Sequence, residues 1–508
     1  MSVIDVIFIG LILCLIAGVI HHFARKTEPA SNTYGDARWA RIDADTDALT
    51  DALAPKGIWL GMMCSNAGRD RWDPLHYGGP RHLLTVAPNR TGKGTCAIVP
   101  NLLTLDHSVL VIDPKGENAA ITARRRRAFG DVHLLNPFNE HGLGTSHFNP
   151  LAHLSLDDPN HVAEVGGIAE ALIISEGNNP HFPNSARDLV EALILHLIET
   201  EPKKGEVATL PKMRALLTAP RIQFLATLGA MVEKSKYDFI SDPAGRFAAG
   251  TDEMASVLST AITQTSFLDN PAIADVLSGA DFRMIDLKDR PTSVYVILPS
   301  RYLVRFARFF RLLVVAAIDQ LQSRPGGVKT TLILDEFAAL GHLSAIETAF
   351  GQAAGFNVQL WPFLQDLNQL KDIYKTRWES FIANAGVVQW FTPNDITTAE
   401  YLSKRLGQMT VQTVSTSTSK NHQGGSSSTS HGETGRPFQT IQDLMSLLLA
   451  ASILTLSGLK HGIYATRFPY YTTLADFSWQ GHRDEEFLAA VKQFWARFHG
   501  YDRNPFHS

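Results

Sequence analysis

The chain of 508 residues is poor in cysteine and has little net charge. Its three cysteines, Cys14, Cys64 and Cys96, are too few and too scattered for a disulfide framework or a zinc site, which fits a reducing compartment. A formal net charge of −4 excludes a natural polycation, so any contact with nucleic acid must come from local basic patches or from a channel made by several subunits. The one conspicuous basic cluster, at residues 124–127, is predicted to be a solvated helix face.

Long hydrophobic runs are scarce too, and we find one, at residues 3–20, in which Asp5 is the only charged residue. As a helix these residues rise about 27 Å, close to the ~30 Å hydrocarbon core of a bilayer, which predicts a transmembrane anchor over residues 1–25. A cleaved signal peptide is the alternative, but no Lys or Arg precedes the run and no small-residue cleavage pattern follows it. Basic residues within 25–41 predict that the main body lies in the cytoplasm.

A glycine-rich turn follows the first strand pattern. Residues 83–86 (LLTV) predict a buried strand, and residues 87–95 (APNRTGKGT) then resemble a phosphate-binding loop, in which backbone N–H groups and a helix N-terminus hold phosphate oxygens. Ala87 replaces the usual first glycine, and Gly94 stands where a hydroxyl ligand for Mg²⁺ is usual. Thr95 is a candidate to replace that ligand, directly or through water. An ordinary strand-to-helix turn is the alternative.

Two further strand patterns end in acids: residues 109–117 (VLVIDPKGE) and residues 331–336 (TLILDE). Asp335 and Glu336 close a buried strand, an arrangement that can hold a metal-bound water and activate another. Apolar runs that end in acids also begin helices, so the pair by itself does not specify a site. Together with the glycine-rich loop, it predicts an ATP-hydrolysing site.

The order of the patterns predicts an α/β fold. Strands alternate with helical stretches over residues 26–157 and again over 281–478, which predicts a mostly parallel sheet with nucleotide at the carboxyl ends of its strands. Residues 158–280 show helical periodicity without a convincing strand and predict an inserted all-α domain. Its expected helices span residues 162–174, 186–198, 214–232 and 254–267.

A polar residue follows each of four strands in the second part of the sheet: Ser300, Asp335, Gln365 and Asn394. Because the carboxyl ends of parallel strands meet at one edge, we expect these residues to lie along it. Gln365 is placed to sense the γ-phosphate or to orient the attacking water. The alternative for a glutamine at a strand end is a hydrogen bond to the backbone.

The last hundred residues contain a low-complexity segment. Residues 415–435 are rich in Ser, Thr and Gly and predict a mobile loop or an extended hairpin tip, which faces the pore of a ring or is inert surface. Residues 452–456 and 463–467 predict strands that close the sheet. Residues 479–508 predict an amphipathic helix and tail.

Several short motifs follow one another from about residue 34 to about residue 475. They are residues 34–40 (YGDARWA), 90–94 (RTGKG), 113–117 (DPKGE), 148–151 (FNPL), 334–337 (LDEF), 365–366 with 369–370 (QD, QL), and 399–404 with 406–407 (AEYLSK, LG). In this order the chain resembles type IV secretion coupling proteins, the membrane-anchored hexameric ATPases of conjugation systems, in their TraG-like branch. The Lys-Gly form of the loop is usual in that branch.

The resemblance implies a RecA-type P-loop ATPase that takes ATP and Mg²⁺ and forms a homo-hexamer at the bacterial inner membrane, single-pass, with its bulk in the cytoplasm. It implies type IV secretion channel subunits and a relaxase–DNA complex or protein effectors as partners. The all-α domain would engage cargo, whereas a plain bundle that stabilises the hexamer is the alternative. The loop residues expected at the nucleotide are Asn89, Arg90, Thr91, Gly92, Lys93, Gly94 and Thr95.

The chemistry of phosphoryl transfer suggests a role for each site residue. Lys93 neutralises the β- and γ-phosphate oxygens, Thr95 and Asp335 position Mg²⁺, Glu336 polarises the attacking water, and Gln365 assists. An arginine from a neighbouring subunit completes the site, with Arg301, Arg377 and Arg405 as candidates. Two other functions stay open: a membrane-tethered DNA translocase without a secretion role, and a cargo receptor that does not hydrolyse nucleotide.

Overall fold

The computed structural model describes residues 31–470, except residues 43, 46–48, 51, 55, 66–70, 176–179, 250–251 and 422–423. The predicted anchor at residues 1–25 and the predicted C-terminal helix lie outside the described residues. Within the described part, no single helix is long and apolar enough to cross a membrane. The bent pair α6 (Leu210–Leu217) and α7 (Arg221–Lys234) meets that test only when its two helices are taken together.

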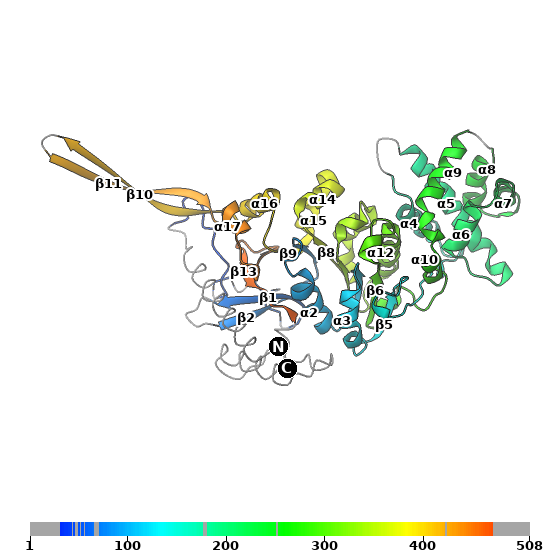
Figure 1. The fold of residues 1–508 in the computed structure, drawn as a ribbon, viewed down its shortest axis with the longest axis horizontal. Coiled ribbons are helices and arrows are strands. Elements are labelled where there is room, and N and C mark those ends of the chain that lie inside the picture. Colours follow the sequence, from blue (N-terminus) through cyan, green and yellow to red (C-terminus); the bar gives the residue numbers. More distant parts are fainter. Residues whose placement is uncertain are drawn as a thin grey trace. The chain divides into compact units, whose positions relative to one another are not determined.

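By packing, the chain divides into two compact units (Figure 1). The first contains the described residues up to 105 together with those from 363 onward, and the second contains residues 106–362. The domain boundaries predicted near residues 157 and 280 both fall inside the second unit and stay a prediction.

The first unit is built on a mixed sheet. Its strand β3 (His82–Val86) pairs in parallel with β9 (Ala385–Trp390) and with the last two residues of β8 (Val358–Leu364). Beyond β9 the strands continue in antiparallel order as β12 (Ala451–Leu456), β13 (Ile463–Thr466), β1 (Ile58–Ser65) and β2 (Arg71–Tyr77). The two closing strands predicted near the end of the chain are therefore present, as β12 and β13. The helices of this unit are α2 (Val99–Thr104), α14 (Leu367–Tyr374), α15 (Trp378–Asn384), α16 (Ile396–Leu406) and α17 (Ile441–Met445).

The second unit contains an all-parallel sheet. Its order is β8, β7 (Thr330–Leu334), β4 (Ser108–Asp113), β6 (Thr292–Ile297) and β5 (Asp131–Leu135). Strands β4, β6 and β7 are buried along their whole length, as continuous apolar runs predict for parallel strands covered on both faces. The α/β fold with a mostly parallel sheet is thus confirmed. The remaining helices near this sheet are α3 (Glu117–Arg126), α11 (Asp286–Asp289), α12 (Ala307–Gln322) and α13 (Ser344–Gln352).

The described residues of segment 158–280 form helices and their connecting loops, without a strand. The α-helices are α4 (His161–Leu172), α5 (His181–Thr200), α6, α7, α8 (Asp238–Ala248), α9 (Asp252–Gln264) and α10 (Pro271–Val276). The prediction of one continuous helix over residues 214–232 is wrong, because α6 ends at Leu217 and α7 begins after Pro220. Proline lacks the backbone N–H and disfavours the helical conformation of the residue before it.

The basic cluster at residues 124–127 is only partly a solvated face. Arg126 is completely buried, and its guanidinium donates to the hydroxyl of Ser293 (2.8 Å) and to the carbonyl of His107 (2.5 Å). Arg124 and Arg127 are exposed as predicted. Burial in a parallel-sheet layer thus changes the role of one arginine in the run, from solvation to holding α3 against the strands.

The low-complexity segment forms a long hairpin, which was one of its two predicted conformations. Strands β10 (Gln408–Asn421) and β11 (Gly424–Pro437) pair antiparallel over their whole length and extend away from the sheet of their own unit (Figure 1).

Candidate nucleotide site

The predicted phosphate-binding loop connects β3 to a helix in the first unit. Its backbone is tightly turned: Arg90 and Gly92 have φ angles of +63° and +87°, and the hydroxyl of Thr91 donates to the carbonyl of Pro88 (2.7 Å). At Lys93 the chain enters a π-helical turn, Gly94–Ile98, that continues into α2. The loop therefore leads into a helix N-terminus, a place where backbone N–H groups and the helix dipole favour an anion.

The two departures from the common loop pattern have visible consequences. A side chain added at Gly94 would meet no atom within 4 Å, so the position of the usual hydroxyl ligand is open space. The hydroxyl of Thr95 donates to the carbonyl of Gly92 (3.4 Å) and lies beside the thiol of Cys96. In this rotamer the hydroxyl of Thr95 donates its hydrogen within the loop and keeps its oxygen lone pairs for a metal ion.

Gln365 lies against the loop. It follows β8, and its side-chain oxygen accepts a hydrogen bond from the amide of Asn89 (3.1 Å). The backbone N–H of Gln365 donates to the side-chain oxygen of Gln369 (2.9 Å). The side chain of Asp366 caps α14 because it accepts a hydrogen bond from the backbone N–H of Gln369 (3.0 Å). Two neighbouring side chains thus hold Gln365 at the carboxyl end of a strand, facing a loop residue that the sequence places at the nucleotide.

Arg467 is a loop-supporting residue that sequence reasoning missed. Its side chain is 1% exposed, and its guanidinium donates to the carbonyls of Thr91 (2.6 Å), Ala451 (3.1 Å) and Leu449. The guanidinium carbon lies 3.4 Å from the centre of the Phe391 ring. Arg467 follows directly after β13, so the only signal in the sequence was a charged residue at the end of a strand of otherwise uncharged residues.

The charge of Arg467 has no carboxylate partner within the described part of the chain. Burial lowers its pKa to about 10, which still leaves the guanidinium protonated at neutral pH. Burial also raises the pKa of the neighbouring Cys96 thiol, so that thiol supplies no counter-charge. A buried charge without a partner is costly, and the cost falls when an anion docks on the loop that the charge supports.

The acids of the second unit occupy the carboxyl ends of β4 and β7. Burial raises the pKa of Asp113 to about 7, and the negative charge of Asp335 contributes to that rise. The carboxyl of Asp113 accepts from the N–H of Ala119 (2.8 Å) and from the amide of Asn118 (3.2 Å). Asp113 therefore holds the first turn of α3, which is a structural role.

Asp335 and Glu336 are less buried than Asp113. The side chain of Asp335 accepts a hydrogen bond from the N–H of Glu336 (3.0 Å), and Glu336 has a left-handed backbone with φ of +55°. A non-glycine residue held in that conformation is a common feature of functional sites. The row of polar strand ends predicted from the sequence is divided between the units: Gln365 and Asn394 belong to the first, and Ser300 and Asp335 to the second.

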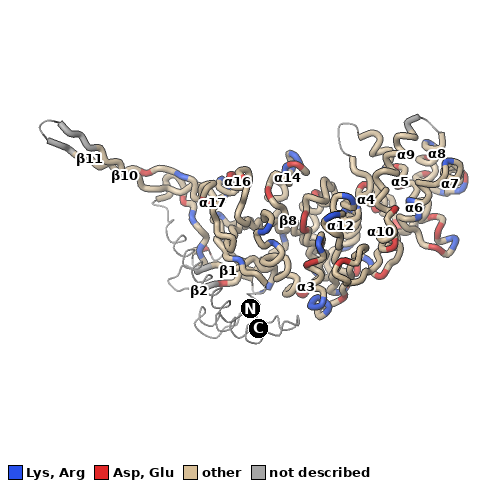
Figure 2. Tube along the Cα trace, in the orientation of Figure 1, with Lys and Arg blue, Asp and Glu red and all other residues tan. Residues whose placement is uncertain are grey.

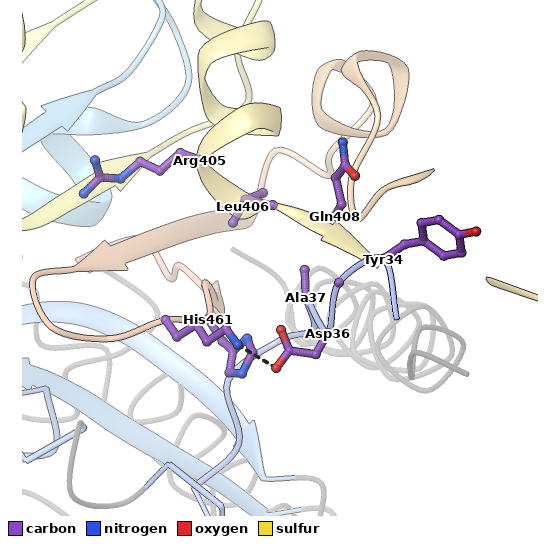
Figure 3. Close-up of a pocket in the computed structure, with 10 residues that line it drawn as sticks. Tyr34, Asp36, Ala37, Arg405, Leu406, Gln408 and His461 are labelled. Atoms are coloured by element: carbon purple, nitrogen blue, oxygen red, sulfur yellow. Dashed lines mark hydrogen bonds and ion pairs between the residues drawn. The ribbon is translucent and has the colours of Figure 1, made fainter. Parts of the chain in front are cut away.

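The three candidate arginines are all exposed. Arg301 lies over the ring of Tyr302 (4.8 Å), and Arg405 donates to the hydroxyl of Thr455 (3.2 Å). Arg405 also lines a pocket of about 380 Å³ in the first unit (Figure 3). Lys460 and Asp36 line the same pocket and form an ion pair with each other (2.6 Å). No residue of the phosphate-binding loop lines this pocket.

Comparison with known proteins identifies the family. A family model described as "Type IV secretory system Conjugative DNA transfer" matches residues 37–497. The conjugal transfer protein TraG of Escherichia coli is 29% identical over 472 residues, which are 84% of this chain and 72% of that protein. The protein VirD4 of Agrobacterium fabrum is 31% identical over 404 residues, which are 76% of this chain and 58% of VirD4.

Solved structures agree on the fold. The unbound conjugative coupling protein TrwBdeltaN70 has a TM-score of 0.57 at 15% identity, covering 76% of this chain and 84% of that one. TrwB has also been solved with the ATP analogue ADPNP and with ADP and Mg²⁺, and these structures resemble the chain with TM-scores of 0.57 and 0.56. Because the family model matches most of its length, the chain belongs to the type IV secretory system conjugative DNA transfer family.

Proposed function

We propose that this protein is a coupling ATPase of a type IV secretion system. It binds ATP at the loop of residues 87–95 and uses hydrolysis to move relaxase-bound single-stranded DNA, an effector protein or both into the secretion channel. Its relative TraG of Escherichia coli is a conjugal transfer protein, and its relative VirD4 of Bartonella quintana, 28% identical over 364 residues, is a type IV secretion system coupling protein. The ADPNP complex and the complex of ADP and Mg²⁺ with TrwB support nucleotide binding on the same fold.

One observation carries the proposal: the loop ends in a lysine and a helix N-terminus, and it is supported by a buried arginine that has no carboxylate partner among the residues that the structure describes. All three features favour a polyanion at the loop, because they supply positive charge and N–H donors at one place. The residues of this site therefore fit a triphosphate.

In the proposed mechanism each residue acts through its own chemistry. Lys93 and the loop N–H groups neutralise the β- and γ-phosphate oxygens, and Gln365, held by Asn89, orients the attacking water. Glu336 polarises that water. Asp335 and Thr95 would hold Mg²⁺, which supplies further charge neutralisation on the phosphate oxygens.

We further propose that six copies form a ring at the inner membrane, anchored through residues 3–20, with an arginine from each neighbour completing the site. Arg301, Arg377 and Arg405 are exposed and thus accessible to a neighbouring copy. Exposure is a necessary condition for that role and does not rank the three.

The proposal is tested with the purified full chain and in cells. We expect Lys93→Ala and Glu336→Gln each to lower ATP turnover at least about 100-fold, because each removes a group that acts on the transferring phosphoryl. Lys404→Ala is the matched control, since Lys404 is an exposed lysine in a surface pair with Glu400 and should leave turnover unchanged.

Transfer assays then separate the alternatives. If the coupling function is correct, Lys93→Ala abolishes both turnover and the transfer of DNA, effector or both. Normal transfer by that variant would support a cargo receptor that does not hydrolyse nucleotide. Turnover and DNA movement without any association with secretion channel subunits in a pull-down would support a translocase with no secretion role.

A further inference from the structure

The β10–β11 hairpin packs against the rest of its unit at its base, and its outer part is exposed. Each strand has 14 residues, and the residues at 412–417 and 427–434 are exposed. A two-stranded hairpin without a covered face is marginally stable in water, and it has two open edges with unpaired backbone groups. A ladder this long therefore needs an explanation that its own packing does not supply.

The base of the hairpin shows how the protein covers such an edge. Residues 35–37 add to β10 as a short antiparallel strand, with the N–H of Ala37 donating to the carbonyl of Gln408 (3.0 Å) and the N–H of Thr410 donating to the carbonyl of Gly35 (2.9 Å). The side chain of Glu433 on β11 accepts from the hydroxyls of Ser31 and Thr33 (2.9 Å each). Beyond this base, no described residue outside the hairpin bonds to either strand.

The outer part of the hairpin has little of the usual protection of free edges, since Lys420 is the only Lys, Arg, Asp or Glu among residues 413–432. Residues 411–419 (VQTVSTSTS) and 424–432 (GGSSSTSHG) contain no Lys, Arg, Asp, Glu or Pro, and the paired strands have no bulge. Among the hairpin residues that are coloured in Figure 2, the charged positions lie near the base. Natural proteins guard long edge strands with charges, prolines or bulges, so an edge with one lysine at its far end and nine uncharged residues before it indicates a strand that is covered in the working assembly.

We propose that hairpins of neighbouring copies of this chain pair edge to edge, β10 of one copy with β11 of the next. Every hairpin offers one edge of each kind, and the two strands are antiparallel, so a second copy continues the antiparallel ladder on either side. Repeated around a closed ring, this pairing leaves no free edge.

The chemistry of the strands favours a copy of this chain over other occupants. Nucleic acid is disfavoured because the outer hairpin has a single basic residue, Lys420, and no Arg, which is too little charge to neutralise a run of phosphates. A foreign peptide would cover one edge, and its side chains would find no pockets among Ser, Thr and Gly. Over residues 411–419 and 424–432 a copy suffers no charge repulsion, and its strand can repeat the like-with-like pairs of the hairpin itself, Ser415 with Ser430 and Thr416 with Thr429.

The main test shortens the hairpin in the full chain. Residues 413–432 are replaced by Asn-Gly, which joins the cross-strand partners Gln412 and Glu433 by a tight turn. Native mass measurement in detergent should then show self-association at least tenfold weaker than that of the unaltered chain. Equal association of the two chains would overturn the proposal.

Two controls exclude misfolding and side-chain effects. The shortened chain should keep its melting temperature and its nucleotide binding, since the hairpin does not contact the phosphate-binding loop in its unit. These two measurements also distinguish the two proposals, because the protein can be a coupling ATPase even if its hairpins do not pair. A variant with Thr413→Ser, Thr416→Ser and Thr429→Ser keeps the backbone ladder and should associate like the unaltered chain.

Cross-linking tests the arrangement itself. Copies with Thr416→Cys are mixed with copies with Thr429→Cys, and linked peptides are identified by mass spectrometry. Because the register between copies is not fixed, the cysteine is also placed in turn at each position of residues 413–417 and 428–432. We expect disulfides between β10 and β11 of different copies. Links between two β10 strands, or no links at any position, would contradict the proposal. So would a hairpin that links to a foreign peptide while shortening the hairpin leaves self-association of the chain unchanged.

Discussion

The phosphate-binding loop and the β10–β11 hairpin belong to the same unit but are held in opposite ways. The loop is short, and side chains distant in sequence fix it: Arg467 bonds to Thr91, and Gln365 bonds to Asn89. The hairpin is long and exposed, and its own backbone ladder holds it. We therefore expect single side-chain changes to have large effects at the loop and almost none in the hairpin.

Arg467→Met gives the largest effect in this comparison. The substitution removes the hydrogen-bond donors of three backbone carbonyls, those of Thr91, Leu449 and Ala451. Because a buried acceptor left without a donor costs about 1–3 kcal/mol, we expect the free energy of unfolding to fall by about 3 kcal/mol or more. Nucleotide binding should weaken as well. Arg467→Lys keeps the charge and should recover nucleotide affinity in part, measured by calorimetry; equal affinities of both variants would show that the buried charge does not support the anion.

Gln365→Leu tests whether the polar contact at the loop serves catalysis. We expect kcat to fall about 10–100-fold with little change in KM, because the side chain is placed for the attacking water rather than for binding. Asn89→Ala removes the same hydrogen bond and should give a smaller loss in kcat. A change in KM alone for both variants would assign the pair to substrate binding.

Asp113 sharpens the comparison, since it is a buried group that, unlike Arg467, can lose its charge. Its pKa of about 7 is above the usual 3.8, so between these values the folded state binds a proton that the unfolded state does not. The free energy of unfolding should therefore fall as pH rises from 5 to 7, by at most about 3 kcal/mol from this group. Asp113→Asn should flatten the pH dependence in denaturant titrations; an unchanged slope would contradict the assignment.

Gly94→Ser should have a small and favourable effect. The position is helical and open, so a serine fits and lowers the entropy of the unfolded chain, worth about 0.5–1 kcal/mol. Its hydroxyl also stands where the usual Mg²⁺ ligand lies, so the Mg²⁺ concentration needed for half-maximal turnover should decrease a few-fold. Gly94→Ala should give the stability without the change in Mg²⁺ dependence.

Single Ser-to-Thr or Thr-to-Ser changes in the outer hairpin should have the smallest effects. Exposed substitutions that keep the backbone ladder change stability by less than about 0.5 kcal/mol. Thermal unfolding of Thr413→Ser and Ser415→Thr checks this. A large loss of stability would mean that these hydroxyls make contacts that their exposure does not indicate.

The sequence predicted the strands and the loop because these signals are local. Residues 83–86 form a continuous apolar run, and the turn after them needs glycine at Gly92, whose φ is positive. The alternating pattern likewise predicted the mostly parallel sheet. The sequence analysis missed the break between α6 and α7, although Pro220 signals it. The reason is that apolar residues continue at helical spacing on both sides of Pro220.

There are physical reasons why the sequence missed the contact of Arg467 and left the hairpin as one of two possible conformations. Nothing near Arg467 in sequence shows that its guanidinium meets Thr91, since that contact depends on the order of strands β12, β13 and β9. The composition of residues 415–435 fits a flexible loop as well as a ladder, because a polar hairpin without a covered face has no hydrophobic pattern.

We propose that one nucleotide and one Mg²⁺ ion are bound both by the loop and by the acids after β7. The most direct test is a cryo-electron microscopy structure of the full chain with ADPNP and Mg²⁺. We predict that Lys93 contacts the β- and γ-phosphates and that Asp335 reaches the ion on the same nucleotide. A nucleotide bound away from residues 87–95, or an Asp335 too distant to share its metal, would contradict the account.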